Sequence, residues 1–189
     1  MFLYRFIDDS SKGHAVQHDA GIELLRQGIL EQFGIAVTEN DICKGKLGKP
    51  YLKGYPHIHF SISHCKGLVI CLISSENCGA DAERIRSYFP KVAARVFSEK
   101  ETELINSLGE SEKNRCFTLL WTLKEAYGKF TGRGIGDMKN VCFDGNNNLA
   151  SNVKDCSFRS FAMGEYIISL CGSYEELLFK DGREITTIK

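Results

Sequence analysis

The stretch W-T-L-K-E-A-Y-G-K, from Trp121 to Lys129, decides how the rest of the chain is arranged. The surrounding run, residues 115–131, is apolar nearly all round and predicts a helix buried inside the protein. A polar stripe interrupts it at the spacing i, i+4, i+7 and i+11, which places its members on one helix face: Thr118, Thr122, Glu125 and Lys129. Taken alone, the stripe is typical of an intrahelical Glu–Lys pair worth about 0.2–0.5 kcal/mol. A chemical role requires partners elsewhere in the chain.

Composition excludes several classes of protein. The 189 residues can form one domain or two small lobes with a proper core. Lys plus Arg equals Asp plus Glu at 24 each, so we expect no binding of nucleic acid. The longest apolar run, Leu68 to Ile73, is too short to span a membrane, and the first nine residues do not resemble a signal peptide. Eight cysteines without a C-x-x-C pair disfavour a zinc ribbon and fit reduced thiols. We expect a cytoplasmic monomer.

Apolar periodicity predicts the same kind of unit twice. Residues 2–7 form a predicted strand and residues 18–33 a predicted helix. Residues 57–73 predict a hairpin that turns at Lys66-Gly67, and residues 156–171 predict a second hairpin that turns at Gly164-Glu165. Because each half of the chain places helices before its hairpin, we expect an α+β fold of two similar lobes, residues 1–84 and 85–189, each a small sheet packed with helices.

Two basic features of the first half each allow two interpretations. Residues 41–56 form a loop rich in glycine and lysine, with lysines at Lys44, Lys46, Lys49 and Lys53. It is either a solvated surface loop or a loop that binds phosphate through its backbone N–H groups and ammonium groups. Arg26 lies within the apolar stripe of the predicted helix, where it is either a snorkelling side chain or an anion ligand.

Acidic residues at two further places differ in what they indicate. Asp81 and Glu83 lie two apart on a predicted strand, residues 78–83, and share one face. They are either part of a wet strand edge or two oxygen ligands for a hard cation. Ser98 and Glu101 have the spacing of a capping box, which predicts a helix that starts after Ser98 and a structural role for Glu101. A turn cluster is predicted at residues 144–148.

The order of these motifs resembles a known family. The motifs are G-K-P at Gly48–Pro50, S-I-S-H at Ser61–His64, G-A-D-A-E at Gly79–Glu83, F-S-x-x-E at Phe97–Glu101 and W-x-x-K-E-A-x-x-K at Trp121–Lys129. Together they resemble the 4'-phosphopantetheinyl transferases, and more closely the surfactin-synthetase-activating type, in which one chain holds two lobes. The resemblance extends from about His18 to Leu170. The third and fifth motifs are specific in this order and separation, whereas each alone is weak.

The resemblance implies a fold, an activity and a set of site residues. The two lobes would be related by a pseudo-twofold axis, with coenzyme A in the cleft between them. The protein would transfer the 4'-phosphopantetheine arm of coenzyme A to a serine of an acyl, polyketide or peptidyl carrier protein and release 3',5'-ADP. Mg²⁺ would be held by Asp81, Glu83 and Glu125, and Lys129 would bind the pyrophosphate. Coenzyme A contacts carried over from the family are Arg26, Lys49, Ser63, His64, Lys124 and Lys129.

Several points stay open at this stage. Glu125 fits a metal ligand, the base for the serine hydroxyl, or a base that acts through metal-bound water. The segment before Arg26 is short, and only Lys12, His14 and His18 are available there for the 3'-phosphate. Ala80 and Ala82 replace the larger aliphatic residues usual in the family's strand. The alternative function is a non-catalytic module that binds coenzyme A or a carrier protein.

Overall fold

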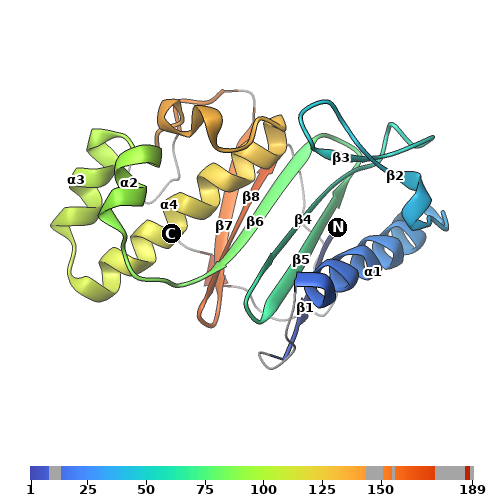
Figure 1. Cartoon of the computed structure of the whole chain (residues 1–189), viewed down its shortest axis with the longest axis horizontal. Helices are drawn as coiled ribbons and strands as arrows, with labels where there is room; N and C mark the ends of the chain where they lie inside the picture. Colours follow the sequence, from blue (N-terminus) through green and yellow to red (C-terminus); the bar gives the residue numbers. More distant parts are fainter. Residues whose placement is uncertain (9–13, 144–150, 155, 173–185, 188–189) are drawn as a thin grey trace.

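The structure is a computed structural model, and it describes residues 1–8, 14–143, 151–154, 156–172 and 186–187 (Figure 1). Helices lie at both ends of the molecule, and strands fill the space between them. The helices are α1 (His14–Phe33), η1 (Glu39–Asp41), α2 (Pro90–Val96), α3 (Glu99–Ser107), α4 (Glu110–Thr131) and η2 (Gly134–Asn140). The strands are β1 (Phe2–Phe6), β2 (Ile42–Lys44), β3 (Pro50–Leu52), β4 (His59–Cys65), β5 (Leu68–Ser74), β6 (Cys78–Arg84), β7 (Ser157–Met163), β8 (Tyr166–Gly172) and β9 (Thr186–Thr187).

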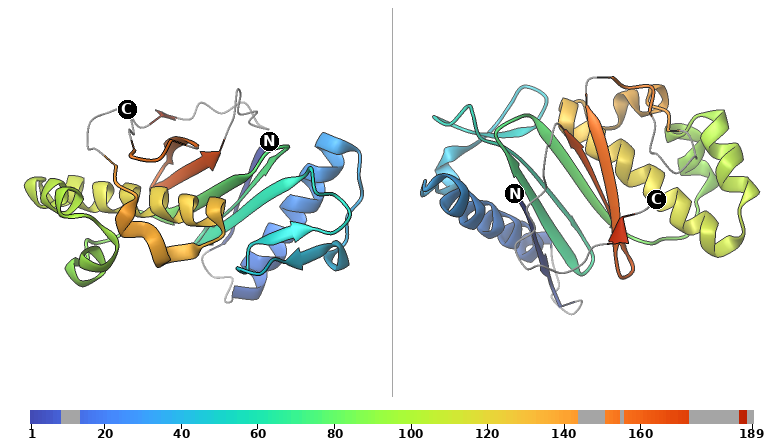
Figure 2. Two further views of the ribbon diagram at one scale, coloured as in Figure 1. Left: turned by 90° about the horizontal axis from the view of Figure 1, so that it is seen from above. Right: turned by 180° about the vertical axis from the view of Figure 1, so that it is seen from behind.

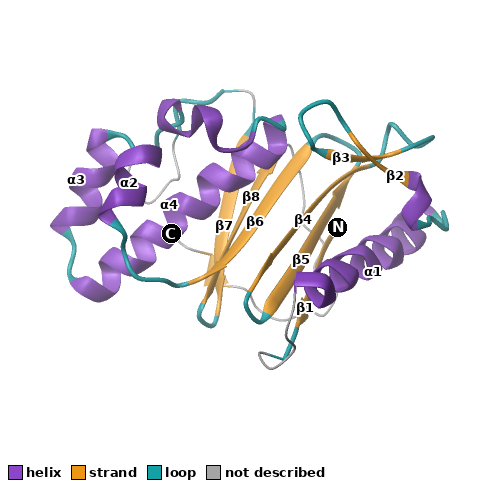
Figure 3. Ribbon diagram, viewed as in Figure 1, coloured by secondary structure: helices purple, strands orange, loops and turns teal. Residues whose placement is uncertain are grey.

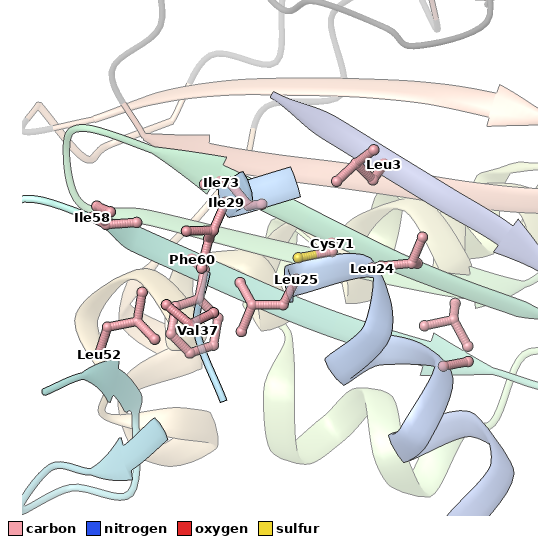
Figure 4. Close-up of a cluster of buried hydrophobic side chains, with 12 residues drawn as sticks. Leu3, Leu24, Leu25, Ile29, Val37, Leu52, Ile58, Phe60, Cys71 and Ile73 are labelled. Carbon is pink, nitrogen blue, oxygen red and sulfur yellow. The ribbon is translucent and has the colours of Figure 1, made fainter. Parts of the chain in front are cut away.

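The first lobe is an antiparallel sheet covered by one helix. Its strands follow the order β1-β5-β4, and the predicted hairpin is confirmed, with His59 opposite Ser74 and Cys65 opposite Leu68. Helix α1 packs on one face of this sheet through Leu24, Leu25 and Ile29 (Figure 4). Strand β5 is apolar on both faces because its second face is also covered, as described below.

The second lobe repeats this topology. Its sheet has the order β6-β8-β7-β9, and α4 packs along β6 and β8. Helices α2, α3 and η2 enclose the far side of α4 around Phe117, Leu123 and Ile105. Apart from β2, β3, β9 and the shorter helices, each half runs strand, long helix, strand, strand, and the last of these strands lies between the other two: β1-β5-β4 and β6-β8-β7. The mixed α and β character predicted from the sequence is confirmed, and the relation between the two halves stays a prediction.

The two lobes share a core rather than a hydrogen-bonded ladder. Leu68, Ile70 and Leu72 of β5 pack against Ala80 and other apolar residues of the second sheet. Strand β4 lies along β6, and the views agree on this placement (Figure 2). The hydroxyls of Ser61 and Ser63 replace backbone pairing, because they accept hydrogen bonds from the N–H groups of Ala80 at 2.9 Å and Ala82 at 3.3 Å. Small side chains on β6 permit this approach.

The element boundaries confirm most predictions and correct some (Figure 3). Helix α4 begins at Glu110, five residues before the predicted start, and the capping box of Ser98 and Glu101 is present at α3. The loop of residues 41–56 contains the short hairpin β2–β3, and α2 and η2 were not predicted. The turn cluster at 144–148 lies outside the described residues. Strand β6 pairs with β8, so a lobe division just before Cys78 agrees better with the hydrogen bonding than one at residue 84.

Candidate active site

The site forms where the backbone of α4 touches the backbone of β6. A Cβ atom built on Gly79 would lie 2.1 Å from the carbonyl oxygen of Ala126 and 2.5 Å from the nitrogen of Phe130. Both neighbours are backbone atoms of a helix, so no side-chain rotation relieves the overlap. The glycine that opens G-A-D-A-E is therefore required for close packing. This packing places the polar stripe of α4 against the face of β6 that carries Asp81 and Glu83.

Asp81 is the buried centre of the site, with a side chain that is 8% exposed. Its Oδ1 accepts a hydrogen bond of 2.7 Å from the hydroxyl of Ser63 and an ion pair of 2.8 Å from Nζ of Lys129. Its Oδ2 is buried and has no hydrogen-bond partner among the described residues. Lys129 thus pairs with Asp81 on the neighbouring strand. Lys129 therefore does more than stabilise α4 through an intrahelical pair with Glu125, which was the simpler alternative. A buried, unsatisfied carboxylate oxygen is costly unless a ligand completes it.

Glu83 is oriented by an aromatic and a basic residue. The indole N–H of Trp121 donates a hydrogen bond to its carboxylate, while burial raises the pKa of Glu83. Nη1 of Arg86 lies 3.7 Å from Oε1 of Glu83, and the guanidinium lies 4.5 Å from the centroid of the Trp121 ring. Thr118 of α4 accepts the backbone N–H of Arg86 at 3.2 Å. Sequence reasoning missed Arg86, because its position depends on packing against α4.

Glu125 carries the most perturbed carboxyl group of this region. Burial raises its pKa to about 7, and the negative charges of Asp81 and Glu83 add to this shift, while Lys129 and Arg86 oppose it. Burial is the largest cause of this shift, and the smaller contributions of Asp81 and Glu83 place the three carboxylates within electrostatic range of one another. Carboxyl groups with perturbed pKa values beside other charges are typical of functional sites. The polar stripe of α4 predicted from sequence therefore faces a second set of charges, as a chemical role requires.

Two adjoining pockets open beside these charges. One, of about 250 Å³, is bounded by Lys129 and the glycines at the end of α4, and by residues 47–50 and β4 on the other side. The other, of about 430 Å³, extends along α1 and is lined by His18, Lys44 and His64. Gly48, Pro50, Phe60 and Ile62 line both, so the two pockets adjoin. The adjoining pockets extend from Lys129 to His18 and His64 of the first lobe.

The predicted contacts of the first lobe divide into two groups. His64 lines the second pocket, in agreement with a ligand-binding role. Arg26 is exposed on α1, and its Nε donates to the carbonyl oxygen of Val37 at 3.0 Å. Ser63 is buried and directs its hydroxyl to Asp81 rather than to a pocket. Lys12 lies outside the described residues. The predicted roles of these residues stay predictions, and for Ser63 the geometry favours orienting Asp81.

Lys124 requires a correction. Its side chain is fully buried, and Nζ forms an ion pair of 2.9 Å with Glu101, which is also fully buried. The ammonium further donates to the carbonyl oxygens of Met138 and Val141. Although Lys124 precedes Glu125, it points about 100° away around the helix, into the core formed by α3 and η2. Its three N–H groups all have protein acceptors, which speaks against the predicted contact with coenzyme A.

The carboxylates fit a hard cation in their chemistry. Asp81 offers an unpartnered buried oxygen. Burial and, to a smaller extent, repulsion by Asp81 and Glu83 raise the pKa of Glu125, and a positive ion would relieve that repulsion. Oxygen donors of this kind suit Mg²⁺. Within the described ranges, no group of three His, Cys, Asp or Glu side chains is close enough to hold a metal ion together. The three residues are thus adjacent but not assembled as a ligand set.

A family model decides the classification. The model for the 4'-phosphopantetheinyl transferase superfamily matches residues 77–176, more than half of the 189 residues and the whole span from β6 to β8. The chain belongs to this superfamily. The matched span includes Gly79, Asp81, Glu83, Glu125 and Lys129, which the structure brings together at one place.

Relatives with known names agree with this membership. The chain is 26% identical to a 4'-phosphopantetheinyl transferase of Bacillus subtilis over 88% of this chain and 77% of that protein. It is 31% identical to HetI of Nostoc, over 68% of this chain and 56% of that protein, and 30% identical to Sfp of Bacillus subtilis, over 61% and 51%. The chain thus spans about half the length of several relatives that it matches. A holo-(acyl-carrier-protein) synthase from Bacillus anthracis in complex with coenzyme A (3',5'-ADP) gives a TM-score of 0.43 at 19% identity, over 50% of this chain and 92% of that one.

Proposed function

We propose that this protein transfers the 4'-phosphopantetheine arm of coenzyme A to a serine hydroxyl of an acyl or peptidyl carrier protein. The observation that carries the proposal is the cluster of Asp81, Glu83, Glu125 and Lys129, whose lysine lines a pocket, in a chain that belongs to the transferase superfamily. A bond forms between the serine oxygen and the phosphorus that bears the pantetheine arm. The bond from that phosphorus to 3',5'-ADP breaks, and the serine proton passes to a base.

Glu125 and Lys129 take the catalytic roles in this scheme. Without a bound cation the pKa of Glu125 is about 7, and a carboxylate of this pKa can accept a proton near neutral pH better than an ordinary glutamate. Lys129 lines the pocket with a side chain that is 31% exposed, so its ammonium can contact a phosphate while Asp81 holds it in place. The second pocket, which His64 and His18 line, would accommodate the nucleotide end of coenzyme A.

Asp81, Glu83 and Glu125 are the residues that would hold Mg²⁺. When bound, the ion would neutralise charge on the pyrophosphate and on the departing 3',5'-ADP. Ser63 and Trp121 orient two of these carboxylates through hydrogen bonds, as partners behind metal ligands commonly do. Glu125 fits a ligand, a base or both.

Three further points are part of the proposal. The shared strand order supports a pseudo-twofold relation between the lobes. The lobes meet through β4 and β6, which are not equivalent strands in that order. Superposing one lobe on the other would measure the rotation that relates them. We also propose that the protein acts as a monomer. In the described part of the chain, no helix has the length and apolar character needed to cross a membrane.

Intact mass spectrometry of an apo carrier protein tests the function directly. After incubation with this protein, coenzyme A and Mg²⁺, we expect a gain of one phosphopantetheine arm on the carrier serine. A carrier in which this serine is alanine is the control. If a broad panel of acyl and peptidyl carriers gains no mass while coenzyme A still binds, the protein is a binding module instead of a transferase.

A further inference from the structure

The lysine of the G-K-P motif has an unexpected environment. Lys49 precedes β3 in the first lobe, yet its Nζ reaches the second lobe. It donates to Oδ1 of Asn77, to the carbonyl oxygen of Cys78 at 3.0 Å and to the carbonyl oxygen of Phe130 at 2.9 Å. An ammonium group has three N–H donors, and here each has a protein acceptor. A phosphate contact would have to displace one of them.

Asn77 contacts the same helix end. Its Nδ2 donates to the carbonyl oxygen of Phe130 at 2.9 Å, so this oxygen accepts hydrogen bonds from two side chains. Phe130 lies in the last turn of α4, where carbonyl groups have no partner within the helix. A lysine ammonium at this end also interacts favourably with the helix dipole. The two side chains therefore act as a cap supplied from outside the helix.

The position of this cap connects three segments of the site. Phe130 follows Lys129 directly, and Cys78 precedes Gly79, whose backbone touches α4. The loop that holds Lys49 forms one wall of the first pocket, and Gly132 packs against the Lys49 side chain, with a Cβ built there lying 3.3 Å from Cβ of Lys49. One ammonium thus joins the pocket wall, the start of β6 and the end of the catalytic helix.

We propose that Lys49 and Asn77 form an interlobe latch that positions Lys129 and the pocket wall, and that the Lys49 ammonium does not bind the nucleotide. This inference rests on the proposed function for its kinetic part, whereas its structural part concerns the ligand-free protein. Burial, which lowers the pKa of Lys49, agrees with an ammonium enclosed by protein. Lys49 is accordingly a positioning residue.

The test compares Lys49→Met with Asn77→Ala and with Lys46→Met as a matched control. Met keeps most of the aliphatic chain of Lys49 and removes its donors, and Lys46 is an exposed lysine of the same loop. The first measurement is hydrogen exchange of the last turn of α4 in protein free of metal and coenzyme A. A latch predicts faster exchange there in Lys49→Met and Asn77→Ala and unchanged exchange in Lys46→Met.

The second measurement is steady-state transfer with a carrier protein. The latch predicts that Lys49→Met lowers kcat between about tenfold and a hundredfold, because a misplaced group loses rate steeply, while KM for coenzyme A changes less than about threefold. Asn77 is exposed, so Asn77→Ala should fold, and we expect it to have a smaller effect of the same kind. If Lys49→Met does not fold, Asn77→Ala alone tests the latch.

The outcomes separate the latch from the alternatives. A KM for coenzyme A raised more than about tenfold in Lys49→Met, with unchanged exchange in α4, would overturn the latch and restore the nucleotide contact. Unchanged exchange in Asn77→Ala as well as in Lys49→Met would also overturn it. If the unaltered protein shows no transfer, the proposed function fails, and the hydrogen-exchange result still decides whether the latch exists.

Discussion

Replacing Lys124 by Met should severely destabilise the protein while leaving the pocket residues in place. The variant removes the counter-ion of Glu101 in a region where both side chains are fully buried. It also leaves the carbonyl oxygens of Met138 and Val141 without their lysine donor. Breaking one partner of a buried ion pair costs about 3–5 kcal/mol. Because domains have a free energy of unfolding of about 5–15 kcal/mol, this loss is a large fraction of the total.

A double variant separates charge from hydrogen bonding. Glu101 accepts from the Ser98 N–H at Oε2 and from the Phe143 N–H at Oε1. Gln has a single acceptor oxygen, so Glu101→Gln can retain the capping box with Ser98 but leaves the Phe143 N–H without its acceptor. In Lys124→Met with Glu101→Gln no buried charge is left unpaired. The Met138 carbonyl keeps the Val141 N–H as a donor, so the remaining cost is the Val141 carbonyl and the Phe143 N–H, about 1–3 kcal/mol for each group. The double variant should therefore cost clearly less free energy than the sum of the two single changes.

Urea unfolding of the four proteins measures this cycle. We expect a coupling free energy of at least about 2 kcal/mol, with m-values that agree among the variants. Additive effects of the two changes, or a cost below about 1 kcal/mol for Lys124→Met, would refute the buried pair as described. A stable Lys124→Met protein with weakened affinity for coenzyme A would instead support the contact first predicted from the sequence.

Three further predictions concern the carboxylates and their support. Glu125→Gln should keep the fold and coenzyme A binding and remove most of kcat. A fully active Glu125→Gln variant in single-turnover assays would contradict the catalytic role of Glu125. Asp81→Asn should lose rate and recover part of it at high Mg²⁺, because mass action refills a weakened site. Gly79→Ala should lower both melting temperature and turnover, because the added Cβ meets the backbone of α4, and an unchanged melting temperature would disprove that close contact. Without Mg²⁺, the melting temperature should fall as pH rises from about 4.5 through 7, because the folded state raises the pKa of Glu125 to about 7 and so favours its protonated form. Glu125→Gln should flatten this pH dependence. An equal slope in both proteins would argue against a raised pKa of Glu125.

The sequence alone determined the features that depend on near neighbours. The face that Thr118, Thr122, Glu125 and Lys129 share follows from 3.6 residues per turn, and the common face of Asp81 and Glu83 follows from the alternation of a strand. The capping box at Ser98 and the turns of both hairpins are also local. These periodicities act over a few residues, so they can be read without knowing the fold. The order of the motifs then identified the family that the family model shows.

Only the tertiary structure decided what the long cationic side chains bind. Lys49 and Lys124 both belong to recognisable motifs, yet both direct their ammonium groups to backbone carbonyl oxygens of distant segments. Every residue has a carbonyl group, so such acceptors leave no signature in the sequence. Arg86 joins the site because Trp121 and Thr118 of α4 hold it there. The flexible four-carbon side chain of a lysine can reach several acceptors, and the tertiary packing around it determines which of these acceptors it binds.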